Sequence, residues 1–289
     1  MREYQATGLE HLALVTELLH AARLANPTGG DWEAADLQWS WRRDQHPDPR
    51  ASTFWLDDDR PAAAIVFTDW GDNFGCQVLD ARHDSASALR IAGTRFTELL
   101  DTFASKPTEM EIRGDDRALI DAASAAGFVA TDEVHVGTMM PASARAPMTA
   151  LPDGFVVSSY AERADRPHHM VARSGEHVAA RLGECAVYRP DLDLCIVETA
   201  TDAVAAYGLF WADTVTGVGL VEPMRTEDAF QGRGLASAVL RAGLDRLAEA
   251  GCSTLKIYFV KGNEPARRAY LGAGFVPQFE SRTYRRAAG

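Results

Sequence analysis

The sequence has few cysteines and no long apolar run. Its 289 residues include four cysteines, which lie far apart and form no C-x-x-C pair: Cys76, Cys185, Cys195 and Cys252. This spacing predicts buried structural thiols in a reducing compartment. A membrane-spanning helix needs ~18 or more apolar residues in succession, and the sequence contains no such segment. We therefore expect no membrane partner.

Positive charge is also scarce. The chain has 29 Lys and Arg against 41 Asp and Glu, a formal net charge of −12 and a pI of about 5.1. Proteins that bind nucleic acids usually present a basic face, so we expect no nucleic-acid partner. A cationic acceptor would suit this chain better. The first 20 residues carry Glu17 within their apolar pattern, which indicates an amphipathic helix and not a signal peptide. This predicts a cytoplasmic protein.

Strand and helix patterns alternate along the chain. The composition, 46% apolar and 24% charged, allows each half to bury a core. We expect helices at 8–25, 85–104, 116–128, 165–182, 233–250 and 263–275. We expect strands in a hairpin over 53–70 that turns in "DDDRP", and at 74–80, 108–113, 133–140, 155–160, 193–200, 203–214, 217–226, 253–260 and 279–286. A Pro-rich, aperiodic stretch lies between the halves. The predicted division is therefore a domain at 1–140, a linker at 141–152 and a second domain at 153–289.

Two segments of the halves are similar in sequence. "ALIDAASAAGFVA" (118–130) aligns with "ARRAYLGAGFVP" (266–277) at Gly-Phe-Val, which places Gly274 147 residues after Gly127 (274 − 127 = 147). A glycine followed by an apolar strand is also a common way to end a helix. Because the preceding helix and the following strand match as well, we interpret the pair as an internal duplication.

A glycine-rich segment opens the predicted helix at 233–250. In Gln231-Gly232-Arg233-Gly234, the glycines give up side-chain capping but permit close approach to the backbone. The free amides and the dipole of a helix N-terminus suit a diphosphate. Arg233 would add charge there or face solvent. The segment is not a Walker loop, because Leu-Ala-Ser follows Gly234, and it lies too late in its domain for a dinucleotide fingerprint.

Residues 216–284 resemble the GNAT superfamily of N-acetyltransferases. The family's coenzyme loop, Q/R-x-x-G-x-G/A, is matched by Gln231, Gly234 and Ala236, between a strand and a long helix. The resemblance implies an α/β fold of two tandem GNAT-like units, each a mixed, mostly antiparallel sheet flanked by helices, with acetyl-CoA as cosubstrate. The coenzyme-binding residues that it implies are Met224, Arg225 and Thr226 for the pantetheine arm, Gln231, Gly232, Arg233, Gly234, Leu235 and Ala236 for the pyrophosphate, and Asn263.

The resemblance also implies two catalytic residues. Tyr270 lies two helical turns after Asn263, where the family places the general acid that protonates the leaving thiolate; the alternative is a packing tyrosine. Glu222 precedes the pantetheine segment in "GLVEPMRT". Strand alternation would place Glu222 on one face with Leu220 and Met224. It then either accepts the proton of the acceptor amine or binds its positive charge, and both roles remain open.

The other polar and aromatic clusters are less informative. His168 and His169 are adjacent and should diverge, and no acid or cysteine has ligand spacing to them, so we expect no metal. Trp32, Trp39 and Trp41 belong to a core or line an acceptor pocket.

The first half lacks the coenzyme loop. It has no glycine between its strand at 74–80 and Gly93, and Ala123 and Asp116 stand 147 residues before Tyr270 and Asn263. We therefore expect a degenerate first half, one coenzyme per chain, and a monomer that is an internal pseudo-dimer. The predicted function is direct transfer of an acetyl group from acetyl-CoA to a primary amine of a small molecule or a peptide N-terminus. Aminoglycosides, polyamines and protein N-termini remain open as acceptors. The alternative is a non-catalytic acyl-CoA-binding sensor module.

Overall fold

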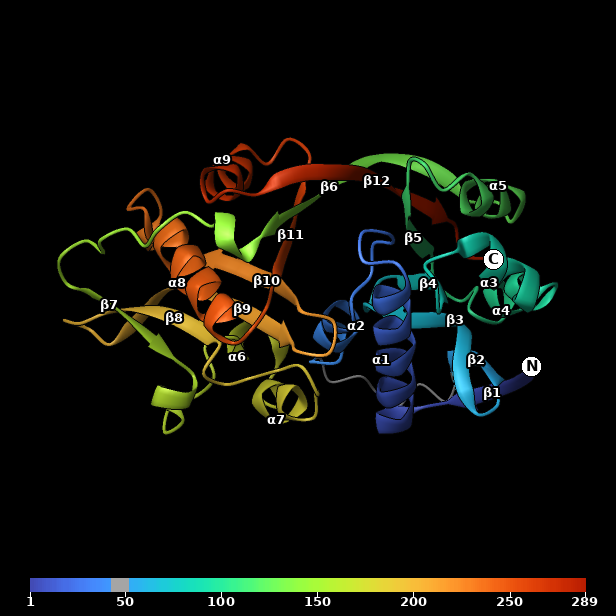
Figure 1. The fold of residues 1–289 in the computed structure, drawn as a ribbon, viewed down its shortest axis with the longest axis horizontal. Coiled ribbons are helices and arrows are strands. Elements are labelled where there is room, and N and C mark those ends of the chain that lie inside the picture. The colour runs from blue at the N-terminus through green and yellow to red at the C-terminus, as the bar shows by residue number, and fades with distance from the viewer. Residues whose placement is uncertain (43–51) are drawn as a thin grey trace. The chain divides into compact units, whose positions relative to one another are not determined.

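The computed structural model describes residues 1–42 and 52–289 (Figure 1). The chain forms two compact units: the first comprises residues 1–37, 45–136 and 279–289, and the second residues 38–44 and 137–278. Each unit therefore includes a short segment from the other half of the chain: residues 279–289 belong to the first unit and residues 38–44 to the second. The predicted division at 141–152, in contrast, follows chain order. That division stays a prediction about where the two related halves meet.

The first unit is built on a mixed sheet with the strand order β1-β2-β3-β4-β5-β12-β6. Its own strands are β1 (Arg2–Ala6), β2 (Ser52–Asp57), β3 (Arg60–Asp69), β4 (Phe74–Asp80) and β5 (Thr108–Arg113), with most of β6 (Val129–Pro141). The strand β12 (Val276–Arg286) comes from the end of the chain. Its residues Ser281–Arg286 pair antiparallel with β5, so the C-terminus completes the sheet of the first unit.

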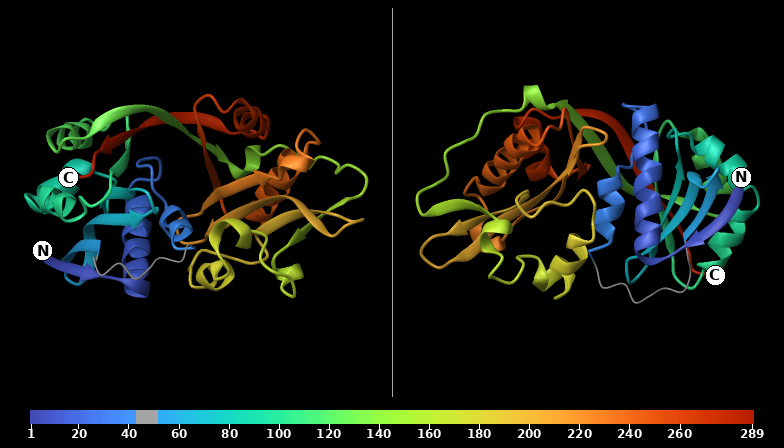
Figure 2. Two further views of the ribbon diagram at one scale, coloured as in Figure 1. Left: turned by 180° about the vertical axis from the view of Figure 1, so that it is seen from behind. Right: turned by 60° about the horizontal axis from the view of Figure 1, so that its bottom comes forward.

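Helices cover both faces of this sheet (Figure 2). The helices are α1 (Gly8–Ala25), α2 (Ala34–Ser40), α3 (Ser85–Ala92), α4 (Arg95–Thr102) and α5 (Arg117–Ala125). Strand alternation divides the apolar side chains between two cores. On β4, for example, Leu79 packs in the core of α1, and Cys76 and Val78 pack in the core of α3, α4 and α5.

The structure confirms most of the expected elements of this half and corrects one. The hairpin turns at Asp58 and Asp59, both with positive φ (46° and 67°), as two-residue hairpin turns require. The single helix expected at 85–104 is wrong, because Gly93 adopts φ 55° and divides it into α3 and α4. The sequence patterns also missed β1 and α2, which are too short for a clear periodicity.

The second unit has a mixed sheet with the order β6-β11-β10-β9-β8-β7. Its strands are β7 (Phe155–Ser159), β8 (Asp193–Glu198), β9 (Ala203–Asp213), β10 (Val218–Thr226) and β11 (Thr254–Val260). Its helices are α6 (Val171–Ser174), α7 (Val178–Gly183), α8 (Leu235–Glu249) and α9 (Glu264–Gly272). The pair β10–β11 is parallel, and β7 to β10 pair antiparallel. Both units thus confirm the predicted fold class.

The internal repeat is visible in the element boundaries. α9 begins and ends 147 residues after α5 (264 − 117 and 272 − 125), and β12 begins 147 residues after β6 (276 − 129). Asp116 and Asn263 cap the two helices in the same way, since their side chains accept from the backbone N–H of Leu119 and Ala266. The same offset therefore relates sequence, helix boundaries and caps.

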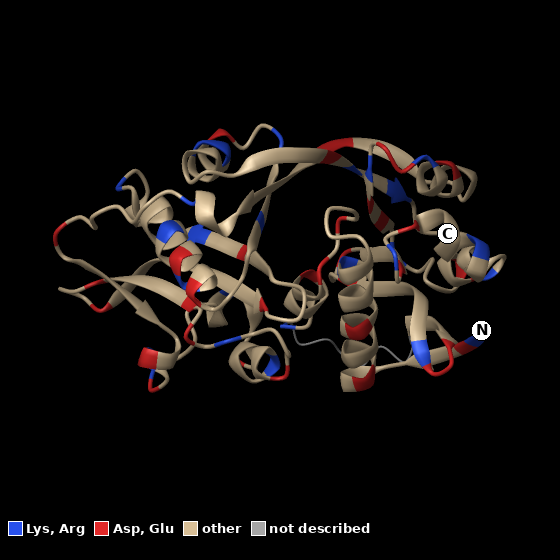
Figure 3. Ribbon diagram, in the orientation of Figure 1, with Lys and Arg blue, Asp and Glu red and all other residues tan. Residues whose placement is uncertain are grey.

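The remaining expectations from composition concern thiols, charge and membranes. All four cysteines are free and buried, as predicted. Acidic residues occur in both units (Figure 3). Within the described parts of the chain, no helix combines the length and the apolar character that a membrane span would need.

Candidate active site

The candidate site of the second unit begins where two parallel strands part. β10 pairs with β11 at Val218–Leu220 and Thr254–Lys256. Further along, Met224, Arg225 and Thr226 pair with β9 on their other side. The edge of these three residues that faces away from β9 is therefore available to an extended ligand, which can add to a strand as a peptide does. The three residues predicted to hold the pantetheine arm lie along this edge.

A β-bulge interrupts β10 between these two parts. The pairing of β10 with β9 shifts between Val221, which lies opposite Phe210, and Met224, which lies opposite Gly208. Three steps on β10 thus match two on β9, which is the signature of one inserted residue. The Glu222–Pro223 peptide bond within the bulge is cis.

The bulge corrects the predicted side-chain alternation. Val221 and Met224 both pack with the core of α8, although they are three positions apart, an odd number that regular alternation would place on opposite faces. Leu220 lies opposite Trp211, whose ring contacts Tyr188 at 5.9 Å on the other face. Leu220 and Met224 therefore lie on opposite faces, and the expectation that Glu222 shares one face with both is wrong. An inserted residue resets the period of two, and no sequence period reveals it.

The glycine loop opens α8 without a side-chain cap. Gly232 and Gly234 have φ 77° and 78°. Residues other than glycine rarely adopt this left-handed region of the backbone. An added Cβ at either position would meet open space. Gly234 is the N-cap residue of α8, and it makes no side-chain hydrogen bond to the amides of the first turn. The amides of the first turn are thus accessible to an anion. This local geometry fits a diphosphate.

The flanking residues of the loop are placed by local contacts. Gln231 Nε2 donates to Asp228 Oδ1 at 3.1 Å. The exposed Arg233 folds over the ring of Phe230, 5.3 Å from its centroid, and Leu235 is buried in the core of α8. Ala236 follows in the first turn of α8.

Asn263 and Tyr270 occupy the helix that follows β11. Asn263 Oδ1 accepts from the backbone N–H of Ala266 at 3.2 Å, so Asn263 is the N-cap of α9. Tyr270 is half-buried on α9, 6.2 Å from the ring of Phe259. Burial, with a smaller contribution from the charge of Glu222, raises the pKa of Tyr270 to about 12. The phenol therefore stays protonated at neutral pH, as a proton donor must.

An aromatic cluster contacts the backbone of Glu222 on the face of the sheet opposite α8. Trp211 is 1% exposed, and its Nε1 donates to the backbone carbonyl of Glu222 at 2.7 Å. Tyr188 and Trp39 contact the Trp211 ring at 5.9 and 6.5 Å. Trp39 comes from the segment 38–44 that the N-terminal part of the chain contributes to this unit. Trp211 and Tyr188 were not singled out from the sequence, because single aromatic residues within an apolar strand or loop carry no site pattern.

The contributed segment is held by specific contacts. Val187 N donates to Gln38 Oε1 at 3.0 Å, and Trp41 Nε1 donates to Glu184 Oε2 at 2.7 Å. Trp39 and Trp41 are both 8% exposed, so they form part of a core that borders the Glu222 strand. Trp32 is partly buried in the core of α1 and does not join them.

His168 and His169 converge, contrary to the sequence expectation. His168 Nε2 lies 2.7 Å and His169 Nε2 2.9 Å from the two carboxylate oxygens of Asp193. Tyr188 also donates to Asp193, at 2.9 Å. The two histidines lie in an irregular segment before α6, where neighbouring side chains need not diverge. The carboxylate is fully buried and 25 residues away from His168 in sequence, which is why spacing did not reveal it.

The hydrogen bonds of His168 indicate protons and not a metal ion between these side chains. The three side chains could hold a cation by proximity, since their ligand atoms lie within 4.8 Å of one another. His168 Nδ1, however, accepts from the backbone N–H of Met170 at 3.1 Å. Its proton is then on Nε2, which donates to Asp193 and is not free to bind a metal. Burial alone would raise the pKa of Asp193, but hydrogen bonds from His168 and His169 outweigh it and lower that pKa.

Comparisons with known proteins agree with this geometry. Residues 156–275 match the model of the Acetyltransferase (GNAT) family. A mycothiol acetyltransferase of Clavibacter sepedonicus is 28% identical over 243 residues, which are 80% of this chain and 78% of that protein. A mycothiol acetyltransferase of Nocardioides sp. is 29% identical over 213 residues, covering 64% of this chain and 71% of the relative.

Solved structures share the fold over the whole chain. A tandem GNAT protein from the clavulanic acid biosynthesis pathway has a TM-score of 0.70 at 16% identity, covering 99% of this chain and 98% of that one. A GCN5-related N-acetyltransferase from Sphaerobacter thermophilus has a TM-score of 0.62 at 13% identity, covering 99% and 95%. At these identities the likeness concerns the fold alone.

Proposed function

Because this chain belongs to the GNAT acetyltransferase family, we propose that it transfers the acetyl group of acetyl-CoA to a primary amine by direct attack on the thioester. The observation that carries the proposal is the opening between β10 and β11. It places an unpaired strand edge beside an uncapped helix N-terminus formed by left-handed glycines. These two features suit the extended arm and the diphosphate of one ligand.

Each candidate coenzyme-binding residue has a defined role in this proposal. The backbone of Met224, Arg225 and Thr226 holds the pantetheine arm, and the loop from Gln231 to Ala236 binds the pyrophosphate. Asn263 adds a side-chain contact to the arm from its position at the start of α9. Strand amides polarise the thioester carbonyl and hold it in place for attack.

Two proton transfers accompany the acetyl transfer. The acceptor amine, with an ordinary pKa near ~10.4, must lose a proton, and Glu222 takes it or binds the charged amine beside the thioester. Tyr270 donates its phenolic proton to the thiolate as the sulphur–carbonyl bond breaks, and the pKa of about 12 keeps that proton on the phenol until then. The charge of Glu222 acts on the Tyr270 phenol, which supports placing both groups at one centre.

The acceptor is tested with a panel of amines. Two relatives carry the name mycothiol acetyltransferase, so a mycothiol-related acceptor joins aminoglycosides, polyamines and peptide N-termini in the panel. Thiol release from acetyl-CoA, followed with a thiol reagent, should rise with at least one amine. Mass spectrometry of the product should show an N-acetyl group. Acetylation of a hydroxyl or thiol instead, or coenzyme binding without release by any amine, would contradict the proposal.

A further inference from the structure

The first unit contains a cavity that the proposed acetyl transfer does not use. Its volume is about 460 Å³. β4 and β5 pair in parallel at Phe74–Gly75 and Thr108–Glu109, and the cavity lies where the two strands continue beyond this pairing. The loops that lead into α3 and α5 and the loop between α1 and α2 complete its wall. Every residue that lines the cavity belongs to the first unit.

The wall of the cavity carries an excess of negative charge. Arg113 is already paired with two of the lining acids, Asp115 at 2.6 Å and Asp31 at 3.6 Å. The field within the cavity therefore favours a cation and opposes a polyphosphate. The lining includes two arginines, Arg113 and Arg117, against six acids: Asp31, Asp80, Asp84, Glu111, Asp115 and Asp116.

A buried amide in the wall has an unused acceptor. Gln77, on β4, is 8% exposed and lines the cavity. Among the residues that the structure describes, its Oε1 has no hydrogen-bond partner. Buried polar atoms are almost always paired in folded proteins, so an unpaired one in a cavity wall indicates a partner that is not part of the chain. A carbonyl oxygen accepts a hydrogen bond from an N–H or O–H donor.

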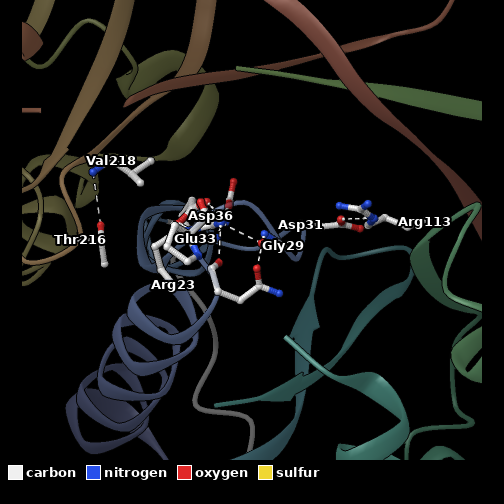
Figure 4. A network of polar contacts seen from close by, with 10 residues as sticks. Arg23, Gly29, Asp31, Glu33, Asp36, Arg113, Thr216 and Val218 are labelled. Atoms are coloured by element: carbon white, nitrogen blue, oxygen red, sulfur yellow. Dashed lines mark hydrogen bonds and ion pairs between the residues drawn. The ribbon is translucent and has the colours of Figure 1, made fainter. Parts of the chain in front are cut away.

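The loop that contributes Asp31 is fixed from within the unit. Arg23 and Glu33 form an ion pair with side chains that are 2% and 3% exposed. The same guanidinium donates to the carbonyl oxygens of Pro27 and Gly29 at 3.0 and 2.8 Å. Figure 4 shows this network and the ion pair of Asp31 with Arg113 at its edge. The wall is thus organised before a ligand enters, which reduces the entropy lost on binding.

The cavity is unsuited to the coenzyme. In the second unit, the amides at the start of α8 have no side-chain cap. In the first unit, Asp84 caps α3 by accepting from Ser87 N at 3.2 Å, and Asp116 caps α5 by accepting from Leu119 N at 3.0 Å. Carboxylates therefore occupy the helix N-termini at which a diphosphate would bind.

We propose that this cavity binds a small molecule with a primary ammonium group. The ammonium supplies the positive charge that the carboxylates of the wall favour and the N–H donor that Gln77 Oε1 lacks. A neutral alcohol of the same length supplies only a donor. A metal cation supplies charge and could take Gln77 Oε1 as a ligand, so competition with Mg²⁺ is part of the test. The proposal concerns the first unit and does not depend on the acetyl-transfer reaction of the second.

The test is calorimetric titration of the full chain without acetyl-CoA. The probe is cadaverine, and 1,5-pentanediol is its neutral isostere. Cadaverine should bind and the diol should not. Asp31→Asn and Gln77→Leu should each weaken one cadaverine site about tenfold, the scale of one charge-assisted hydrogen bond. Asp121→Asn, an exposed acid on α5 outside the cavity lining, serves as the matched control and should bind like the wild type.

Four results would overturn the proposal. The first is equal binding of cadaverine and the diol, and the second is cadaverine binding that neither variant changes. The third is a second acetyl-CoA site that Asp31→Asn abolishes, since the cavity would then be a coenzyme site. The fourth is a cadaverine site that Mg²⁺ occupies competitively, with the same dependence on Asp31. If Gln77→Leu does not show a wild-type thermal transition, Asp31→Asn alone decides.

Discussion

The indole of Trp211 donates a hydrogen bond of 2.7 Å to the backbone carbonyl of Glu222. The bond joins a residue of the aromatic cluster to the bulge that carries the candidate base. Because Trp211 is itself packed against Tyr188 and Trp39, the position of Glu222 depends on residues far away in the chain.

The coenzyme loop is tested at Gly234 with two isosteric substitutions. Gly234→Asn and Gly234→Asp both place a side chain that tolerates left-handed φ into the open space before α8. Only the aspartate adds a negative charge beside the pyrophosphate. We expect calorimetry to show weaker acetyl-CoA binding for both, with aspartate at least about tenfold weaker than asparagine, or ~1.4 kcal/mol. Equal affinities of the two variants would exclude a phosphate at this helix start.

The proton donor is tested by Tyr270→Phe, which keeps the ring and removes the proton. Turnover should fall by ~10²–10⁴, with acetyl-CoA affinity unchanged. Since the pKa of Tyr270 is raised to about 12, the phenol keeps its proton through the alkaline range, and wild-type turnover should show no loss from this group below about pH 11. Tyr284→Phe in the first unit is the control. A Tyr270→Phe enzyme with wild-type turnover would leave Tyr270 a packing role only.

The two roles left open for Glu222 differ in their pH dependence. If the carboxylate accepts a proton, Glu222→Gln should lower kcat by about 10² or more, most strongly at lower pH, where the acceptor amine is charged. Steady-state kinetics over a pH series separates kcat from KM. A rise in the acceptor KM alone, of equal size at every pH, would show that Glu222 binds the amine and takes no proton. Glu249→Gln, an exposed acid at the end of α8, should change neither constant.

The buried carboxylate of Asp193 should stabilise the second unit. Asp193→Asn replaces an acceptor that faces three donors, so we expect a loss of about 2 kcal/mol in the free energy of unfolding, measured with urea. Because the folded pKa of Asp193 is lowered, its contribution is present above the ordinary carboxyl pKa of about 3.9 and is lost as the pH falls through the folded value. The difference between wild type and variant should therefore shrink in acid.

The control for this substitution lies two residues away. Asp191 is half-exposed and pairs with Arg189, so Asp191→Asn should change the unfolding free energy by less than about 1 kcal/mol. If Asp193→Asn were equally mild, the contacts with His168 and Tyr188 would be incidental to stability.

The second half of the chain should not function alone. A fragment of residues 151–289 lacks the segment with Trp39 and Trp41, and it lacks β6, the neighbour of β11 in the sheet. It also carries residues 281–286 without their partner β5. We expect this fragment to aggregate in size-exclusion chromatography and to release no thiol, and residues 1–150 supplied in trans should restore some activity. A monomeric fragment with full activity would contradict this dependence.

Local patterns were sufficient to predict most of the fold. The apolar spacing of α1 predicted its bounds, and "TEMEIR" predicted β5, because both depend on a few neighbouring residues. The 147-residue repeat likewise predicted the match of α9 with α5. Local reasoning failed at the break between α3 and α4, where the positive φ of Gly93 outweighs an amphipathic pattern that continues across it.

The surroundings of the candidate site depend on contacts that no spacing records. Asp193 meets His168 across 25 residues, and Trp39 meets Trp211 across most of the chain. The bulge at Glu222 inserts one residue into a strand whose apolar pattern looks regular. The loop at Gly232 and Gly234 could be predicted because its chemistry lies in consecutive residues, whereas a pocket wall is assembled by tertiary structure.

The placement of β12 in the first unit has a consequence for biosynthesis. A ribosome delivers the N-terminus first, and domains usually fold as they emerge. Here β5 is made before the whole second unit, but residues 281–286, its antiparallel partner, are made after most of that unit. The edge of β5 therefore stays open while the second unit is synthesised, and the first unit can close only after residues 281–286 have been made. Synthesis of β12, and not completion of the N-terminal half, is then the event that ends the exposure of this edge to aggregation.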